Sequence, residues 1–348
     1  MKKQYSINEI AQILNISTNK LRFYEKKGLI NPVRDDTNNY RYYTEENLVK
    51  IQTILMYRTL NLTIKDIQNL MKNCTKNNTI NHFYNQWEVI NDEMQRMRLI
   101  KTCLEETMDL IYESDEYNFL NSIIKSVKKL NDIQKIKNNW KDRWNFDSWA
   151  KTYDESIKEN KGKLKIYKNY EKILDEVFKK AIENTKNDMK LLEIGVGTGN
   201  LAKRFLEKGY NIIGVDQSRE MLNIAKEKFP KLKLRLGEFL KLPFENNAFD
   251  CIVSSYALHH LNDEEKKIAI KEMLRVLKLD GKIIIGDLMF ENKKNKKEIL
   301  DSFTQEQIVE VEDEYYSNID FLKEEFKKHG KKINYTRIDQ LNYVVKFY

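Results

Sequence analysis

The sequence predicts a multidomain chain, in which an α-rich N-terminal part with a long coiled-coil helix precedes an α/β domain built on a doubly wound sheet. Three observations lead to this prediction. Two short amphipathic helices flank a three-residue turn within the first 28 residues. Apolar residues then recur at a spacing of three or four over positions 80–111. From residue 190 onwards, short apolar runs alternate with amphipathic helices, as they do in a parallel sheet.

Composition limits the class of protein. The chain has 348 residues, enough for two or three units, and 33% of them are charged. No apolar run approaches the roughly 20 residues that a membrane span needs, and the N-terminus lacks the apolar core of a signal peptide. Cys74, Cys103 and Cys251 are too widely spaced for a disulfide framework or a metal pair. We therefore expect a cytoplasmic protein with reduced thiols and no membrane partner.

The first elements read as a helix-turn-helix. Ser6 can cap a helix whose apolar face carries Ile7, Ile10 and Leu14. The turn NIS separates this helix from a second one, which ends at Gly28 in a C-cap position. The net charge of the whole chain is +8, and Lys and Arg are in densest excess over the first 72 residues. This excess favours attraction to phosphates.

The continuation NPVRDDTNNYRYYTEENL sharpens this interpretation. Residues 4 to about 72 resemble the MerR family of transcriptional regulators, including its recognition helix, its wing and its third helix. The resemblance implies a nucleoid-associated protein that binds double-stranded operator DNA, with Thr18 and Arg22 in the major groove. Its implied DNA contacts are Thr18, Arg22, Tyr24, Tyr40 and Arg41. We expect Phe23 and Tyr43 to pack inside, and Asn39 to replace a glycine that is common in the wing.

A coiled-coil seam follows. Its apolar positions, interrupted by Lys101, are Ile80, Phe83, Trp87, Ile90, Met94, Met97, Leu104, Met108 and Ile111. The MerR resemblance implies that this helix pairs antiparallel with its twin and makes a homodimer. A helix that packs along its own domain is the alternative. The expected segments are a DNA-binding domain at 1–75, a dimerisation helix at 76–112, a helical linker at 113–145 and an α/β domain at 146–348.

The α/β domain begins with the most informative stretch of the chain. LLEIGVGTGN is an apolar run that ends in a glycine loop, and IIGVDQS is a second run that ends in Asp216. The glycines allow a sharp turn and a close approach of the backbone to a ligand. The spacing from Gly195 to Asp216 places the acid at the tip of the neighbouring strand, where it can accept hydrogen bonds from a ribose. Asn200 occupies the position of the third glycine in a dinucleotide-binding loop, so the loop departs from that pattern. The Lys and the Ser or Thr of a Walker phosphate loop are missing, which excludes that type of loop.

These motifs resemble those of class I S-adenosylmethionine (AdoMet) methyltransferases. Further matches are GEF at 237–239, FDCIVSSYALHHL at 249–261 and MLRVLKLDGKIIIGD at 273–287. The resemblance implies AdoMet as cofactor, bound by Tyr153, Glu193, Gly195, Gly197, Gly199, Asp216, Glu238 and Ser254. Tyr153 belongs to a W-A-x-x-Y-D element that closes over the methionine end of the ligand. For Trp149 of the same element, packing is the preferred role.

Catalysis needs an acceptor held in line with the methyl group and, for some acceptors, a base. His259 and His260 follow the fourth strand and are the candidate base, although one of them can instead cap or support a helix. We expect no metal, because adjacent side chains point apart and no carboxylate partner is evident. Residues 288–318 overhang the pocket as a substrate lid, with Tyr315 and Tyr316 near the acceptor. The run ENKKNKKE reads as a solvated turn.

Two functions fit these patterns. The favoured one is a transcriptional regulator whose α/β domain methylates a small molecule. The alternative is a regulator that uses the domain only to sense AdoMet or its demethylated product. Methylation of a DNA base amine is disfavoured, because SSYA stands where a flipped base needs an acid or Asn followed by Pro-Pro and an aromatic residue.

Overall fold

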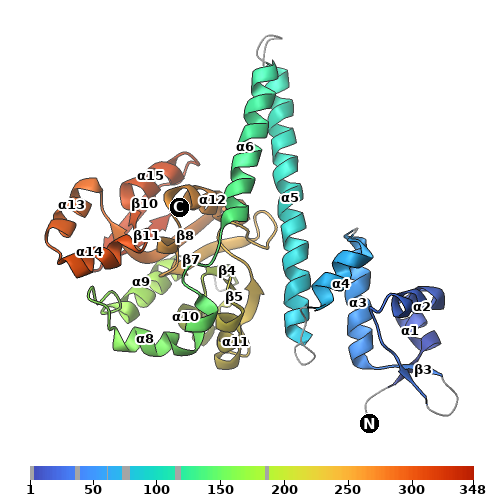
Figure 1. The fold of residues 1–348 in the computed structure, drawn as a ribbon. Helices are drawn as coiled ribbons and strands as arrows, with labels where there is room; N and C mark the ends of the chain where they lie inside the picture. The colour runs from blue at the N-terminus through green and yellow to red at the C-terminus, as the bar shows by residue number, and fades with distance from the viewer. Residues whose placement is uncertain (1–3, 36–39, 61, 73–78, 114–118, 185–187) are drawn as a thin grey trace. The chain divides into compact units, whose positions relative to one another are not determined.

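The structure is a computed structural model that describes residues 4–35, 40–60, 62–72, 79–113, 119–184 and 188–348 (Figure 1). It divides into two compact units, Met1–Met94 and Gln95–Tyr348. Asn39 and Cys74 lie outside the described residues, and so does the side chain of Ile80. None of the described helices combines the length and apolar character that crossing a membrane requires.

The first unit contains the predicted helix-turn-helix. Its elements are β1 (Tyr5–Ser6), α1 (Ile7–Ile13), α2 (Thr18–Lys26), β2 (Val33–Arg34), β3 (Arg41–Tyr43), α3 (Glu45–Thr59) and α4 (Ile64–Lys72). Ser6 and Glu9 form a capping box at the start of α1, and Ser17 caps α2. Gly28 follows α2 with a φ of +68°, in the left-handed region that ends many helices. The three strands pair antiparallel in the order β1-β3-β2, and β2 and β3 form the wing.

A single apolar cluster holds this unit together. Ile10 of α1, Leu21 of α2 and Ile51 of α3 are fully buried in it. Tyr43 is buried in the same cluster, as the sequence predicted. Residues from the two helices of the helix-turn-helix and from α3 therefore share one core, which fixes the exposed face of α2 relative to the wing.

A pair of long helices follows. Helix α5 (Thr79–Glu113) covers the predicted coiled-coil range, and α6 (Phe119–Asn139) lies beside it in the region expected to be a helical linker (Figure 1). An ion pair of 2.7 Å between Lys129 and Glu106 joins the two helices. The boundary between the compact units falls inside α5, after Met94.

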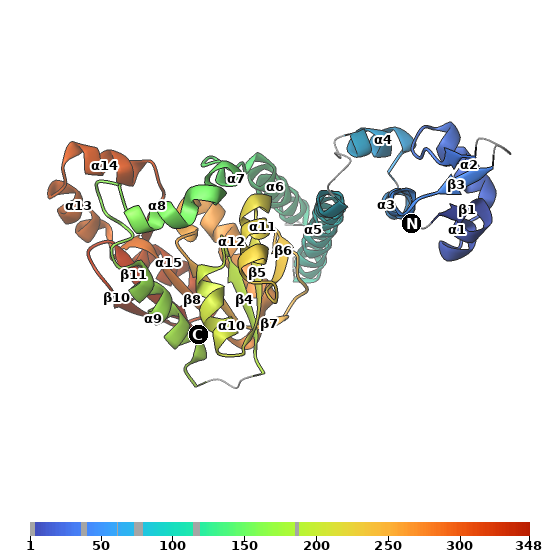
Figure 2. The same cartoon turned by 90° about the horizontal axis from the view of Figure 1, so that it is seen from below.

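The second unit is built on a mostly parallel sheet (Figure 2). Its strands are β4 (Lys190–Ile194), β5 (Asn211–Asp216), β6 (Lys233–Leu236), β7 (Phe249–Ser255), β8 (Leu277–Phe290), β9 (Ser317–Asn318), β10 (Ile333–Arg337) and β11 (Asn342–Phe347). The order β10-β11-β8-β7-β4-β5-β6 has β11 and β10 antiparallel at one edge, while β9 pairs with the end of β8. This confirms the doubly wound sheet and both closing strands.

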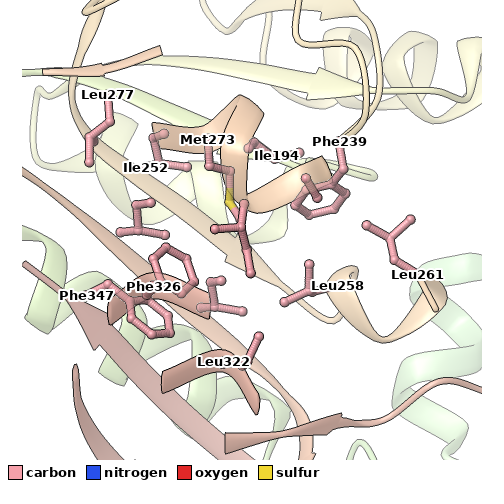
Figure 3. Close-up of a cluster of buried hydrophobic side chains, with 14 of the residues drawn as sticks. Ile194, Phe239, Ile252, Leu258, Leu261, Met273, Leu277, Leu322, Phe326 and Phe347 are labelled. Atoms are coloured by element: carbon pink, nitrogen blue, oxygen red, sulfur yellow. The ribbon is translucent and has the colours of Figure 1, made fainter. Parts of the chain in front are cut away.

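Helices cover both faces of this sheet. They are α7 (Phe146–Trp149), α8 (Tyr153–Glu159), α9 (Tyr170–Ile182), α10 (Asn200–Glu207), α11 (Arg219–Lys228), α12 (Asp263–Val276), α13 (Lys293–Asp301), α14 (Gln305–Glu312) and α15 (Ile319–Lys327). Gly286 faces α9 so closely that a Cβ there would lie 2.7 Å from side-chain atoms of Ile173 and Val177. On the opposite face, Ile285 belongs to the apolar core that α12 and α15 share with the sheet (Figure 3).

One prediction about the insertion after β8 is wrong. The basic run at residues 291–298 is not a solvated turn, because most of it lies in helix α13. Asn292 caps this helix by accepting a hydrogen bond from the backbone N–H of Asn295, and Ile299 buries its apolar side. The cap and the burial of Ile299 favour a helix in this highly charged segment.

Candidate functional site

A cavity of about 700 Å³, counted with the space open to solvent, lies at the carboxyl ends of β4, β5 and β7. This is the edge at which doubly wound sheets bind ligands. The segment that leads from α6 into α8 covers it. The lining residues are Trp140, Phe146, Trp149, Tyr153, Tyr167, Ile194, Gly195, Gly197, Asp216, Gln217, Met221, Gly237, Glu238, Phe239, Tyr256, Ala257, His260 and Leu261.

The glycine loop forms the floor of this cavity. Gly195 and Gly197 both line it with positive φ values of +73° and +51°, where side chains with a Cβ are strained. A Cβ on Gly195 would also lie 2.5 Å from the Cβ of Ala257. Gly199 does not line the cavity. It is the N-cap of α10, where a Cβ would lie 2.9 Å from the ring of Phe229. The loop therefore needs glycine for its backbone and for its close packing.

Asp216 lies at the tip of β5, as the spacing predicted. Its Oδ2 accepts a hydrogen bond of 2.8 Å from the backbone N–H of Gly197, and its Oδ1 accepts one of 2.9 Å from that of Ser218. Burial raises the pKa of this carboxyl to about 6. The backbone of Gln217 donates to the same carboxylate, which has about four acceptor sites and so keeps acceptor capacity for a ribose hydroxyl group. The glycine cradle and this buried acid fit the nucleoside part of AdoMet.

The neighbouring wall continues the nucleoside site. Glu238 follows β6 and lines the cavity with Gln217 and Met221. Gln217 accepts a hydrogen bond of 3.1 Å at Oε1 from the indole Nε1–H of Trp140. Trp140 comes directly after α6, so the end of that helix contributes to the ligand wall. No sequence motif indicated this contact, because it joins positions 77 residues apart.

Aromatic side chains make up the other end of the cavity. Tyr153 lies over the glycine loop, with its Cε1 3.8 Å from the place where a Cβ of Gly197 would be. Trp149 also lines the cavity, contrary to the packing role that the sequence favoured, while its indole N–H donates to Ser156. Tyrosine and tryptophan faces attract cations, and the sulfonium of AdoMet is a cation. This end therefore fits the methionine part of the ligand.

A hydrogen-bonded clamp holds the covering segment against the glycine loop. The carboxylate of Asp154 accepts hydrogen bonds from Thr198 Oγ1 at 2.6 Å and from Asn200 Nδ2 at 2.9 Å. Lys228 pairs with the same carboxylate at 2.7 Å. Asp154 is the acid of the W-A-x-x-Y-D element, so that pattern identified the segment but not the clamp.

Three of the expected cofactor contacts do not line the cavity. Gly199 has the packing role described above. The side chain of Glu193 is buried beneath the loop, where it accepts a hydrogen bond from the backbone N–H of Ala202, and burial raises its pKa well above the usual range. Ser254 is fully buried and donates to the carbonyl of Ile194 at 2.8 Å, which ties β7 to β4. The structure thus gives these residues supporting positions under the loop.

The two adjacent histidines have different surroundings. Nδ1 of His259 lies 2.5 Å from the buried carboxylate of Asp287, which also accepts the backbone N–H of Leu258 and His259. Burial by itself would lower the pKa of His259, but the Asp287 carboxylate outweighs this effect and raises it. His259 does not line the cavity, and its contacts with Asp287 stabilise the turn η2 (Leu258–His260).

His260 is the histidine that reaches the cavity. Its Nδ1 lies 3.0 Å from Oε2 of Glu314, in the segment that leads from α14 to β9. An ionised carboxylate can only accept, so this contact favours a hydrogen on Nδ1 and leaves Nε2 free to take a proton. Burial and the neighbouring His259 lower the pKa of His260. A neutral imidazole beside the methyl-donor site is what a general base requires.

The reasons given against a metal are wrong in this geometry. The rings of His259 and His260 lie 4.0 Å apart, and each has a carboxylate partner. His259, His260 and Glu314 bring ligand atoms within 4.8 Å of one another. Both Nδ1 atoms already face carboxylates, an arrangement that suits proton transfer.

The predicted lid contacts the histidine turn. The backbone N–H of Tyr315 donates to the carbonyl of His259 at 2.9 Å, and the ring of Tyr316 packs near that of His259. The buried ammonium of Lys266 donates to the carbonyl of Tyr315 at 2.5 Å. Tyr315 and Tyr316 are not among the residues that line the cavity. The contribution of their segment is Glu314, which contacts His260, and His260 lines the cavity.

In the first unit, some of the expected DNA contacts are exposed and one, Tyr24, is buried. Arg22 and Tyr40 are exposed, and Thr18 begins α2. Tyr24 is only 1% exposed and packs in the core, whereas Phe23 is 42% exposed, so these two expectations were interchanged. Helix α2 turns position 24, and not position 23, toward the side that carries the buried Leu21.

Arg41 is held in place by α2. Its Nε pairs with Oε2 of Glu25 at 2.7 Å, and Arg34 pairs with Oε1 at the same distance. Burial of Glu25 is outweighed by these two arginines, which lower its pKa. The carboxylate therefore fastens both strands of the wing to α2, a role that the sequence did not reveal for Arg41.

Comparisons with known proteins agree with both halves of the chain. Residues 5–74 match the family model of the MerR HTH family regulatory proteins, and residues 192–285 match that of a methyltransferase domain. An uncharacterized methyltransferase of Oceanobacillus iheyensis is 36% identical over 205 residues, which are 58% of this chain and 93% of the relative. One from Alkaliphilus oremlandii is 35% identical over 205 residues, 58% of this chain and 94% of the relative.

Two solved structures match part of this chain. The YcgJ protein of Bacillus subtilis has a TM-score of 0.41 at 24% identity, covering 48% of this chain and 71% of its own. The PH0226 protein of Pyrococcus horikoshii has a TM-score of 0.43 at 19% identity, covering 52% of this chain and 90% of its own.

Proposed function

This chain belongs to the family of bacterial methyltransferases that these relatives represent, and we propose that it is a DNA-binding regulator whose α/β domain methylates a small molecule with AdoMet. The observation that carries the proposal is the cavity between Gly197, Asp216, Glu238 and Tyr153. It offers a backbone cradle, a buried ribose acceptor and an aromatic end for the sulfonium. His260 stands at the same cavity with a carboxylate partner.

The chemistry divides between ligand and protein. AdoMet supplies an activated methyl group, which passes to a nucleophile as the S–CH₃ bond breaks. The protein has to hold the acceptor in line with that bond and to receive a proton from the acceptor. Nε2 of His260 can take this proton, while Glu314 holds the ring and stabilises the resulting imidazolium.

Titration calorimetry with AdoMet tests the proposal directly. We expect one AdoMet site for each chain, followed by product formation with at least one member of a panel of thiols, amines and phenols. AdoMet binding without turnover on any acceptor would instead support the alternative function, a regulator that only senses the cofactor. Absence of AdoMet binding would refute both.

The regulator half of the proposal rests on the first unit. Arg22 projects from the exposed side of α2, and Tyr40 is 68% exposed beside the wing. A recognition helix with an adjacent wing fits one half-site of duplex DNA, so two copies are needed for a near-palindromic operator.

Arg22→Ala should weaken the discrimination between operator and unrelated DNA. An arginine that contacts a guanine edge is worth about 1–3 kcal/mol of discrimination, so specificity should fall by roughly 5- to 150-fold. Fluorescence anisotropy with an operator selected in vitro and with a scrambled duplex measures this ratio. The control is Lys26→Ala, an exposed residue near the C-terminal end of the same helix. Equal losses on both duplexes would mean that Arg22 contacts only phosphates.

The proposed homodimer uses the apolar seam of α5. Several of its members are exposed in the single chain, among them Met97 at 55% and Leu104 at 58%. A row of exposed apolar side chains at coiled-coil spacing favours pairing with a second copy.

The double substitution Met97→Glu and Leu104→Glu should make the protein a monomer. Both side chains are exposed within one chain, so the folded monomer should tolerate the change, whereas a dimer would bury unpaired charges at a cost of several kcal/mol. Sedimentation velocity measures the result, with Arg96→Glu as an exposed control on the same helix. A dimer that persists in the double variant would contradict the seam.

A further inference from the structure

The second unit contains another cavity, which no step of the proposed reaction uses. It measures about 820 Å³ with the space open to solvent and lies between α5, α6 and α12. Its lining residues are Gln95, Arg98, Leu99, Thr102, Cys103, Glu106, Ser126, Lys129, Leu130, Ile133, Lys137, Ile268, Lys271, Glu272 and Arg275. Leucine and isoleucine side chains form one part of the wall and charged groups the other.

Lys137 is the unusual member of this lining. Its residue is only 9% exposed, so its ammonium group has lost most of its water. Among the described residues, its hydrogen bonding amounts to one contact, with Oε1 of Gln95 at the long distance of 3.5 Å. An ammonium group can donate three hydrogen bonds, and buried charges are costly without a partner. Burial accordingly lowers the pKa of Lys137.

Most of the remaining charges of the cavity already have partners, and Lys271 is exposed to solvent. Arg98 pairs with Glu245, Lys129 pairs with Glu106, and Arg275 pairs with Glu272. Both acidic residues of the lining are therefore engaged by arginine or lysine. Lys137 makes no ion pair within 4.0 Å among the described residues, so a buried positive charge is left without an ionic partner at the cavity.

We propose that this cavity binds a small organic anion, with a carboxylate or phosphate group on Lys137 and an apolar body against Leu99, Leu130 and Ile133. The anion would supply the hydrogen-bond acceptors that Lys137 lacks. A simple inorganic ion is not the best ligand, because such an ion would leave the apolar wall of the cavity in contact with water.

The position of the cavity links it to the AdoMet site. Lys137 lies in the last turn of α6, and Trp140, directly after this helix, lines the AdoMet cavity and donates to Gln217. Gln95 of α5 donates to the carbonyl of Leu242 at 3.0 Å, shortly after Glu238 in the loop that follows β6. Occupancy by an anion should therefore change AdoMet affinity, and linkage requires the reverse effect. This second part rests on the proposed function.

The test uses the full chain and two probes, phenylacetate for carboxylates and phenyl phosphate for phosphates, with phenylacetamide as the neutral control. We expect at least one anion to raise the midpoint of thermal unfolding, and the amide to leave it unchanged. The shift should disappear in Lys137→Met and persist in Lys137→Arg and in Lys135→Met, an exposed lysine of the same helix. An equal shift with the amide, or an unchanged shift in Lys137→Met, would overturn the site.

A second measurement tests the linkage. AdoMet affinity, measured by calorimetry, should change at least threefold when the wild-type cavity is saturated with the effective anion, and it should stay constant in Lys137→Met. Without anion, both proteins should bind AdoMet equally. A constant affinity in the wild type would refute the linkage alone. Failure of all AdoMet binding would refute the proposed function, while the thermal result would still decide the anion site.

Discussion

Asp216→Asn should lower the affinity for AdoMet at least tenfold while the fold survives. The carboxylate is the buried acceptor that the structure offers to the ribose, and a hydrogen bond to a charged acceptor is worth about 1.5–3 kcal/mol. Calorimetry of the full chain measures the loss. Asp280→Asn is the matched control, because Asp280 is exposed and lies toward the start of β8, whereas the cavity lies at the carboxyl ends of the strands. Wild-type affinity in Asp216→Asn would remove Asp216 from the ribose site.

The same carboxylate predicts a pH dependence. Since burial raises the pKa of Asp216 to about 6, the group becomes protonated as the pH falls through that value and loses one of its acceptor sites. AdoMet binding should therefore be constant above about pH 7 and should weaken below about pH 6, with this change missing in Asp216→Asn. The raised pKa also means that the stabilising contribution of this group is full at low pH and is lost as the pH rises through 6. Removal of its charge should consequently not unfold the protein.

His260→Ala should lower kcat by about 10²–10⁴-fold on any acceptor that must lose a proton, which is the usual contribution of a positioned base. AdoMet affinity should remain close to that of the wild type. Glu314→Gln should have a smaller effect, because it leaves the imidazole in place and removes only its charged partner. The measurement is formation of the demethylated product at saturating AdoMet. His259→Ala serves as the contrast, since it should reduce stability by disturbing the contacts of Asp287.

The pH profile separates a base from a structural role. Burial lowers the pKa of His260, so the rate should fall with decreasing pH only below the ordinary histidine value of 6.5. Saturating AdoMet keeps the titration of Asp216 out of the profile. Addition of a chelator should leave the rate unchanged, and a loss restored by Zn²⁺ would reassign His259, His260 and Glu314 as metal ligands. An unaltered kcat in His260→Ala would show that the acceptor needs no base from this position.

The sequence predicted the fold better than the details of each side chain. The alternation of strands and helices predicted from residue 190 onwards begins with β4 at Lys190–Ile194, and Gly195 and Asp216 meet at one cavity. The period of apolar runs and the geometry of a βαβ unit determine both results. Tyr24 and Phe23 were interchanged, since adjacent helix positions differ only by the rotation of α2. Periodicity could not resolve that rotation between two aromatic residues.

Long-range contacts account for most of what was missed. Glu193 and Ser254 belong to motifs that bind the cofactor as a group, yet their side chains lie under the glycine loop and support it. Trp140 and Glu314 reach the site from segments that carry no motif. Such residues become visible only when chain segments far apart in sequence are brought together by the tertiary fold.

The aromatic wall of the AdoMet cavity also makes the protein its own optical reporter. The chain has four tryptophans, of which Trp140 and Trp149 line the cavity and Trp144 contacts the ring of His260 at a centroid distance of 4.4 Å. Trp87 belongs to the other unit. Three of the four indole fluorophores therefore sense the same cavity, so entry of a charged ligand or of an acceptor should change the intrinsic emission without any label. Rapid mixing could then follow cofactor capture and product release in the unmodified chain.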